Sequence, residues 1–529
     1  MIRLCGQRGK APFTLLLQAI AQDGAVTRRT LAPHAQVREH RRHRDRRRDE
    51  HHGRHRQRRA KGEVAPREHG RPVLEEPLEQ RGEHGRSATG KEGDEPYTCI
   101  TPPGAPSLGP PNQGLASFIL VQATIVAQAR PGIWNSAGVS LSYASNLIAG
   151  YSQERASTAA MARDKAALAA ERQGLATIPA PPPEGKIKTM PLDRDPAWYA
   201  GDAARAIADN IVSFQTPTGG WGKNQDRSAP ARVRGQMYIP FDSKAGAHAA
   251  ADLAGGWGFV GTIDNDATTT ELAFLARAQA GRPGADGARY RTAFVQGIRY
   301  LLQAQQPSGG WPQVYPLQGG YHDALTLNDD AMLRATALLQ RVAAGTGDYG
   351  FVPPALRTAA REAAARAMAT LLATQVVVDG RRTIWAQQYD PLTLRPVGAR
   401  NFEPIALATA ESAAVLRFLM EEPDPSPAMR AAITAGAAWF AAHGIENHAW
   451  TDATTPGGRR LIDQPGAKTL WARFYDPATE RPVFGDRDRS IHDDVNAISL
   501  ERRNGYAWFN TTGANVAAAY AKWRRRYGG

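Results

Sequence analysis

Two helical segments of this 529-residue chain end in the same turn, and this repeat constrains the fold more than any other feature. One copy reads Gln215-Thr-Pro-Thr-Gly-Gly-Trp221 and the next Gln306-Pro-Ser-Gly-Gly-Trp311, with a degenerate third at Gly255-Gly-Trp257. A glycine pair ends a helix, and the Trp after it can staple the turn to a core or stack on a sugar ring. One helix pair cannot bury its apolar face alone. The repeat therefore predicts a mainly α fold, an α/α barrel (toroid) of paired antiparallel helices with long loops.

Apolar residues recur at helical spacing through eight segments of the chain. These segments are Pro196–Gln215, Ala267–Ala280, Tyr290–Gln306, Asp330–Ala344, Ala355–Thr374, Pro404–Glu421, Pro427–His443 and Ala514–Arg525. Strand patterns are few and short, at Gln375–Val378 and Thr383–Trp385. The sequence thus predicts a helical catalytic domain over residues 191–529.

The N-terminal 110 residues differ in composition from this body. His40–Arg59 holds ten Arg against three acids, a net of +7, which is half of the formal charge of +14. A run with so few apolar residues cannot pack a core. It is either a disordered basic arm that binds nucleic acid or acidic polymers, or a segment that results from a start site placed too far upstream. We favour the second interpretation and expect no nucleic-acid partner.

Residues 111–190 are interpreted as a signal-like run followed by an Ala/Pro-rich linker. Ala116–Ala129 is a short apolar run that ends in Ala-x-Ala, as secretory signals do, although a basic flank is missing. A buried strand or helix explains the same run. Helix-prone text at Ser157–Gly174 precedes Pro179–Gly185, a semi-rigid spacer. No apolar stretch is long enough to span a membrane.

Four polar clusters interrupt the helical body. They are Trp221–Asn224 with Lys223; Gly261–Glu271 with Asp264, Asn265 and Asp266; the loop Gly309–Met332 with His322, Asp323, Asn328, Asp329 and Asp330; and two blocks that begin at Trp385 and Trp471. Both blocks read Trp-Ala-x-x-Tyr-Asp-Pro and continue to Arg-Pro. They predict two equivalent hairpins that present Arg residues near one place.

The acids of these clusters allow two interpretations. Asp or Asn before a helix is most often an N-cap, and Asp266 fits that role for one helix and Asn328 or Asp329 for the next. Doubled and tripled acids exceed what one cap needs. Oxygen ligands without Cys or His favour Ca²⁺ or Mg²⁺ over zinc, although neither loop has EF-hand spacing. Cation-binding acids together with several Arg suit an anionic substrate that the metal bridges.

The ordered set of motifs resembles the polysaccharide lyase family 10 pectate lyases. It comprises GGWGKNQD, GTIDNDATTTEL, GGWPQVYPL…YHDALTLNDDAM, IWAQQYDPLTLRPVGARNFEP and FYDPATERPVFGDRD, and it spans about residues 193–529. The resemblance implies an α/α barrel and calcium-assisted β-elimination on (1→4)-α-D-galacturonan, giving 4,5-unsaturated oligogalacturonates. It also implies secretion or export to the periplasm, because the substrate is a polymer, and we expect the enzyme to act as a monomer.

The resemblance also implies roles for individual residues. Asp264, with acids of the Asp329-Asp330 pair, would hold calcium, and Arg400 rather than Arg395 would be the base. The expected substrate-binding residues are Lys223, Asn265, His322, Asp323, Arg395, Arg473 and Arg487. His322 departs from the small polar residue expected there.

Two alternatives remain open at this level. A glycoside hydrolase on the same helical fold would use two carboxylates, such as Asp264 and Asp329, without a metal. A polyanion-binding protein would act through His40–Arg59, and its function would be lost with residues 1–110.

Overall fold

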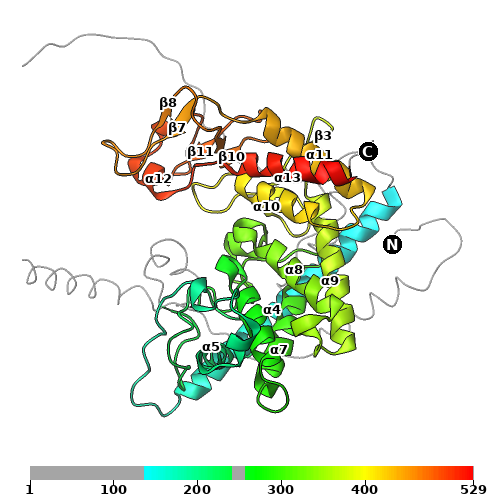
Figure 1. Ribbon diagram of the computed structural model, residues 1–529, viewed down its shortest axis with the longest axis vertical. Helices are drawn as coiled ribbons and strands as arrows, with labels where there is room; N and C mark the ends of the chain where they lie inside the picture. The colour runs from blue at the N-terminus through cyan, green and yellow to red at the C-terminus, as the bar shows by residue number, and fades with distance from the viewer. Residues whose placement is uncertain (1–135, 241–256, 528–529) are drawn as a thin grey trace, which may run out of the picture. The chain divides into compact units, whose positions relative to one another are not determined.

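The structure, a computed structural model, describes residues 136–240 and 257–527, which belong to one unit, Pro106–Gly529 (Figure 1). The basic run His40–Arg59 and the signal-like run Ala116–Ala129 lie outside the described residues. Among the described residues, no helix is long and apolar enough to cross a membrane.

The described part is mainly helical, as predicted. Its α-helices are α4 (Ser136–Arg172), α5 (Asp202–Ser213), α6 (Thr269–Ala280), α7 (Ala288–Ala304), α8 (Ala331–Ala344), α9 (Pro354–Ala373), α10 (Thr409–Met420), α11 (Pro427–Ala442), α12 (Leu500–Gly505) and α13 (Thr512–Tyr527). Helix α6 packs against α7, α8 against α9, and α10 against α11 and α13. One continuous cluster of buried apolar side chains runs from α5 to α13 and forms the core.

All eight predicted helical segments contain a helix, but two begin later than predicted. In Pro196–Gln215, the extended backbone of Gly201 separates a short 3-10 turn from α5. In Pro404–Glu421, α10 starts only at Thr409, because the residues before it form a strand that pairs with Phe474–Tyr475. Tertiary pairing overrides helical spacing there.

The strands are short and antiparallel. They are β1 (Leu325–Thr326), β2 (Val377–Val378), β3 (Arg381–Arg382), β4 (Gln388–Tyr389), β5 (Pro396–Val397), β6 (Leu407–Ala408), β7 (His448–Trp450), β8 (Leu461–Asp463), β9 (Trp471–Ala472), β10 (Phe474–Tyr475), β11 (Phe484–Gly485), β12 (Ile491–His492) and β13 (Phe509–Asn510). Strands β1, β4 and β5 form a three-stranded sheet, and the others pair as β2–β3, β6–β10, β7–β8, β9–β13 and β11–β12. The second predicted strand, Thr383–Trp385, lies just after the observed β3.

The repeated turn staples helix ends to the core. The indole N–H of Trp221 donates to the carbonyl of Ile211 in α5, and Trp311 donates in the same way to Leu301 in α7. Both indoles are fully buried. Gly309 has a φ of 103°, a conformation that favours glycine, so the Gly-Gly pair is needed to bring each Trp back onto its helix.

A glutamine in each turn also links one helix pair to the next. The Gln215 amide donates to the carbonyl of Ala293 in α7, and the Gln305 amide donates to Ala363 in α9. The structural counterpart of Gln215 is therefore Gln305, one position before Gln306, with which the sequence comparison of the two turns pairs it.

A copy of the turn that the sequence did not reveal lies at Trp385. Gln375 donates to the carbonyl of Ala432 in α11, and Trp385 donates to Leu371 in α9. The hairpin β2–β3 takes the place of the glycine pair. The expected Gly255-Gly256 lies outside the described residues, and Trp257 packs in a separate small cluster.

The two Trp-Ala-x-x-Tyr-Asp-Pro blocks form equivalent hairpins, as predicted. The Asp390 carboxylate accepts from the backbone and the hydroxyl of Thr393, and Asp476 accepts in the same way from Thr479. These side-chain bonds fix both turns in one geometry.

Helix α4 packs against the repeated Gly-Gly-Trp turns, although it lies within the expected linker. The Asp164 carboxylate accepts hydrogen bonds of 2.8 Å from both the backbone N–H and the hydroxyl of Thr218, in the first repeated turn. The Ser157 hydroxyl accepts from the backbone N–H of Leu317, in the loop that follows the second. Part of residues 111–190 is therefore packed onto the helical body.

Candidate active site

The polar loops before α6 and α8 carry unusual backbone conformations. Asn265, Asp266 and Thr268 before α6, and Asp329 and Asp330 before α8, all have positive φ. Such conformations cost energy in residues other than glycine and persist only where the surroundings impose them. Their concentration at two neighbouring helix N-termini marks these loops as a candidate site.

These loops and the two hairpin blocks enclose a cavity of about 290 Å³. Six of the residues selected from the sequence line it: Lys223, Asp264, Asn265, Asp329, Arg400 and Arg473. The other lining residues are Phe259, Gln313, Tyr321, Asn328, Gln387, Gln388, Ala399, Glu403 and Tyr506. We call this the first cavity.

Asp264 is a buried carboxylate held by three neighbours. Its side chain accepts from the Lys223 ammonium at 2.5 Å and from the Gln313 amide at 2.9 Å, while its backbone N–H donates to Thr262. Burial would raise the pKa of Asp264, but the charge and hydrogen bond of Lys223 outweigh burial and lower the pKa. Lys223 also lies 3.6 Å from the Phe259 ring centroid.

Asp329 is in the opposite electrostatic situation. Burial, followed by repulsion from Asp264 and Glu411, raises its pKa to about 6. Asp264 and Asp329 both line the first cavity, and the charge of Asp264 contributes to the raised pKa of Asp329. Two carboxylates in one cavity repel each other unless a proton or a cation lies between them.

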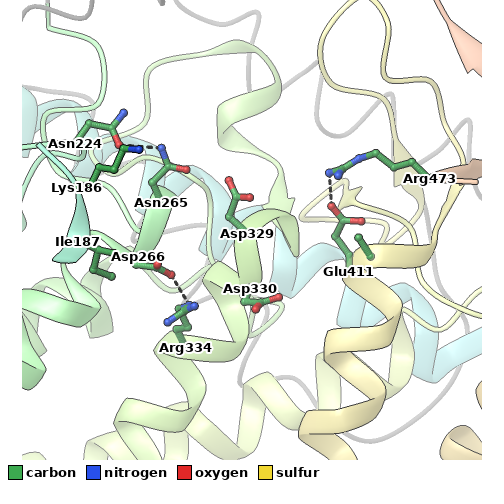
Figure 2. A pocket seen from close by; sticks show the side chains of 11 residues that line it. Lys186, Ile187, Asn224, Asn265, Asp266, Asp329, Asp330, Arg334, Glu411 and Arg473 are labelled. Carbon is green, nitrogen blue, oxygen red and sulfur yellow. Dashed lines mark hydrogen bonds and ion pairs between the residues drawn. The ribbon is translucent and has the colours of Figure 1, made fainter. Parts of the chain in front are cut away.

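A second cavity of about 480 Å³ adjoins the first and shares Asn265, Asp329 and Arg473 with it (Figure 2). Asp330 lines this second cavity and is not among the residues of the first. The predicted calcium residues therefore divide, with Asp264 and Asp329 in the first cavity and Asp330 in the second.

Two ion pairs also line the second cavity (Figure 2). Arg334 pairs with Asp266, and Arg473 lies 2.6 Å from the Glu411 carboxylate. Asp266 therefore contacts an arginine, and the N-cap residue of α6 is Thr268.

Arg400 is fixed by Glu403. Its guanidinium donates to the two Glu403 oxygens at 2.8 Å and 2.5 Å, and Tyr506 donates to the same carboxylate at 2.6 Å. Burial alone would lower the pKa of Arg400, but the hydrogen bonds and charge of Glu403 raise it above its ordinary value. Arg400 is thus cationic before substrate binds.

Arg473 presents a second fixed cation to both cavities. Burial would lower its pKa, but attraction to the Glu411 carboxylate, and then to those of Glu403 and Asp329, raises it above its ordinary value. The guanidinium carbon also lies 5.0 Å from the Tyr506 ring centroid, within cation–π distance.

Four of the predicted substrate-binding residues do not line either cavity. Arg395 is exposed in the hairpin between β4 and β5. Arg487 pairs with Glu501 at 3.0 Å. Asp323 accepts from the backbone N–H groups of Gln318 and Gly319 and so closes its own loop. These contacts organise the surroundings of the first cavity.

His322, the fourth, lies behind the cavity wall. Its ring stacks on Tyr321 at 3.9 Å and meets the Phe259 ring edge-on at 5.1 Å, and it is only 2% exposed. Burial, and then repulsion by Lys223, lowers its pKa to about 4. The neutral imidazole therefore supports two rings that do line the cavity.

Some lining residues were missed by the sequence reading. Glu411 lies inside α10, and Tyr506 follows α12, so no polar loop marked either of them. Gln313 and Glu403 stood inside quoted motifs, but amides and single acids there are common in turns. Only their convergence in space distinguishes them.

The donor set fits a calcium ion that protein and substrate share. Asp264 and Asp329 supply hard oxygen ligands in one cavity, and burial and repulsion from Asp264 both raise the pKa of Asp329. Over residues 136–240 and 257–527, no group of three or more His, Cys, Asp or Glu side chains gathers as a metal site.

Comparisons with known proteins show to which family the chain belongs. The pectic acid lyase family model matches residues 215–517, more than half of the chain. A family 10 polysaccharide lyase from Cellvibrio cellulosa has a similar structure, with 30% sequence identity and a TM-score of 0.52, over 64% of this chain and 97% of that one. An Asp-to-Ala mutant of that lyase, in complex with trigalacturonic acid, matches with the same identity and TM-score over 64% and 99%. No curated protein sequence matches the chain.

The family match and the solved structures confirm the resemblance expected from the motifs. Residues 215–517 include every quoted motif block and both walls of the first cavity. The chain belongs to the pectic acid lyase family and is a pectate lyase of polysaccharide lyase family 10.

Proposed function

We propose that this pectate lyase cleaves polygalacturonate by calcium-assisted β-elimination in the first cavity. The observation that carries the proposal is the convergence of two close carboxylates, Asp264 and Asp329, with the cations Lys223, Arg400 and Arg473 around one cavity. An anionic sugar needs cations for its carboxylate, and a shared metal needs oxygen ligands beside them.

Asp264 and Asp329 would hold the calcium ion beside the substrate. Neutralisation of the C6 carboxylate is the chemistry that the ion supplies, because it makes the C5 proton more acidic. Lys223 and Arg473 orient uronate carboxylates by charge-assisted hydrogen bonds. These fixed donors need no rearrangement as charge develops on the sugar.

Arg400 is the proposed base. It takes the proton from C5, the electrons of the C5–H bond form the C4–C5 double bond, and the bond from C4 to the leaving oxygen breaks. The leaving oxygen then takes a proton from water. Since Glu403 holds Arg400 in its charged form, the guanidinium must lose a proton before it can accept one, and the rate must therefore rise with pH.

The hydrolase alternative is not favoured by the positions of the acids. Glycosidases that retain configuration keep their two carboxyl groups about 5 Å apart, and those that invert keep them further apart. Asp264 is already paired with Lys223 at 2.5 Å and bonded to Gln313, so it is not a free proton donor or nucleophile. Two carboxylates that share a cavity with three cations suit an anionic substrate and a shared metal better than they suit hydrolysis.

Two broader proposals accompany this function. The helix pairs close into an α/α toroid, which the links from Gln215 to α7, Gln305 to α9 and Gln375 to α11 support. The enzyme is exported, because its polymeric substrate cannot enter a cell.

The test uses the full chain and polygalacturonate. Elimination gives an unsaturated product that absorbs ultraviolet light, and a calcium chelator should abolish its formation. Arg400→Ala should lose turnover with its fold intact, whereas Arg395→Ala, in the exposed hairpin, serves as the control. Reducing ends without new absorbance would overturn the lyase mechanism in favour of hydrolysis. Full activity of Arg400→Ala would transfer the base to another residue.

A further inference from the structure

The segment before residue 190 is docked onto the active-site loop. The backbone N–H of Gly185 donates to the Asn224 carbonyl at 2.9 Å, and that of Asp226 donates to Pro183 at 3.1 Å. A Cβ added at Gly185 would lie 2.4 Å from Cα of Asp226, so only glycine allows this close approach. The end of the expected linker is therefore held in place by its backbone.

This docking carries Lys186 to the wall of the second cavity. Figure 2 shows Lys186 with Asn224 and Asn265 on one side of this cavity, and Arg473 with Glu411 on the other. The second cavity shares residues with the first, so a polymer that leaves the first cavity on that side enters the second.

Lys186 is electrostatically unlike the other two cations of this cavity. Arg334 pairs with Asp266, and Arg473 pairs with Glu411. Among the interactions found for the described residues, the Lys186 ammonium has no acidic partner. It is an uncommitted cation beside the path of a polymer that carries one carboxylate per sugar.

We propose that Lys186 binds the carboxylate of a galacturonate unit adjacent to the one held in the first cavity, which makes the second cavity a further subsite. This inference rests on the proposed function. Lys186 precedes residues 215–517, the part of the chain that the family model matches, and so extends the binding site beyond it. A lysine that is merely solvated would contribute no such contact.

The test compares Lys186→Ala with Lys188→Ala in the full chain. Lys188 is exposed two residues away and lines neither cavity, so it is a matched control for loss of charge. We expect the KM for polygalacturonate to rise about five- to tenfold in Lys186→Ala, the loss of one charge-assisted contact, with kcat changed less than about twofold. Lys188→Ala should match the wild type, and Lys186→Arg should recover most of the affinity.

Three results would overturn the subsite. They are an unchanged KM in Lys186→Ala, an equal rise in both variants, which would indicate long-range attraction only, and a fall in kcat alone. Failure of the proposed function is distinct, because the wild-type protein would then form no unsaturated product. The effect should also shrink with oligogalacturonates too short to fill both cavities.

Discussion

Two buried arginine–glutamate pairs of this protein share one local design but have different surroundings. Glu271 and Glu411 are each the third residue of a helix, α6 and α10, and each helix begins with a Thr. Arg227 and Arg473 reach them from loops, at 2.8 Å and 2.6 Å. The Arg227 side chain is fully buried, whereas that of Arg473 is 14% exposed and lines both cavities.

The difference lies in the charge around each pair. Burial lowers the pKa of Arg227, because Glu271 is the single acid that opposes it. At Arg473 the pKa is raised, since Glu411 and several other acidic groups outweigh burial. A pair balanced one to one holds a fold together. Arg473 lines both cavities, so the cation of its pair with Glu411 is also accessible to a ligand.

The largest expected effect is on the stability contributed by the fully buried Arg227–Glu271 pair, which we call the closed pair. Arg227→Met leaves Glu271 charged and buried without a partner, which should lower the free energy of unfolding by about 3–5 kcal/mol. Urea denaturation followed by circular dichroism measures this change. The double variant Arg227→Met/Glu271→Leu should recover most of the stability and keep wild-type turnover. Loss of turnover in a stable double variant would mean that this pair also serves catalysis.

Arg473 lines both cavities, and we call its pair with Glu411 the open pair. Removal of this pair should affect activity more than stability. In Arg473→Gln/Glu411→Gln, two neutral amides can still hydrogen-bond to each other, so the free energy of unfolding should change by only about 1 kcal/mol. Without the cation, kcat/KM on polygalacturonate should fall by about 10²- to 10³-fold. Equal losses of stability in the two double variants would remove the distinction between the pairs.

The sequence predicted the repeated turns well, because their determinants are local. Glycine at positive φ and a Trp at fixed spacing identify the copies at Trp221 and Trp311. The copy at Trp385 was missed because a hairpin replaces its glycine pair. The copy predicted at Trp257 stays a prediction, because its glycines lie outside the described residues. Whether a motif staples a helix depends on which carbonyl its indole meets, and spacing alone does not reveal that.

The candidate site was predicted less completely. Loops dense in polar residues identified Asp264 and Asp329, because excess acids exceed the needs of a helix cap. His322 and Arg395 also lie in polar segments of the sequence. His322 is buried behind the cavity wall, however, and Arg395 faces solvent. Glu411 stood in apolar helical text. The direction of a side chain is a tertiary property, which explains why the sequence alone does not show which polar residues line the cavities.

The raised pKa of Asp329 also predicts that the affinity for calcium depends on pH. The pKa of Asp329 is raised to about 6, so this carboxyl is protonated at a pH where an ordinary Asp is ionised. A ligand to calcium must be ionised. The affinity for calcium should therefore be full above pH 6 and fall up to about tenfold per pH unit below it. Calorimetric titration with calcium measures this, and Asp329→Asn should bind weakly with little pH dependence. An affinity that is constant between pH 7 and pH 5 would contradict the role of Asp329.

A third pair, Arg400 and Glu403, offers the finest test of how an acid partner tunes a cation. Glu403 raises the pKa of Arg400, so removal of its charge in Glu403→Gln should make the guanidinium easier to deprotonate. If Arg400 is the base, the rising alkaline limb of kcat/KM should move to lower pH, by up to about one unit, which corresponds to about 1.4 kcal/mol. Tyr506→Phe removes a bond to Glu403 but keeps its charge, so its profile should move much less. A limb that stays in place in Glu403→Gln, with the rate still rising, would mean that the titrating base is not Arg400.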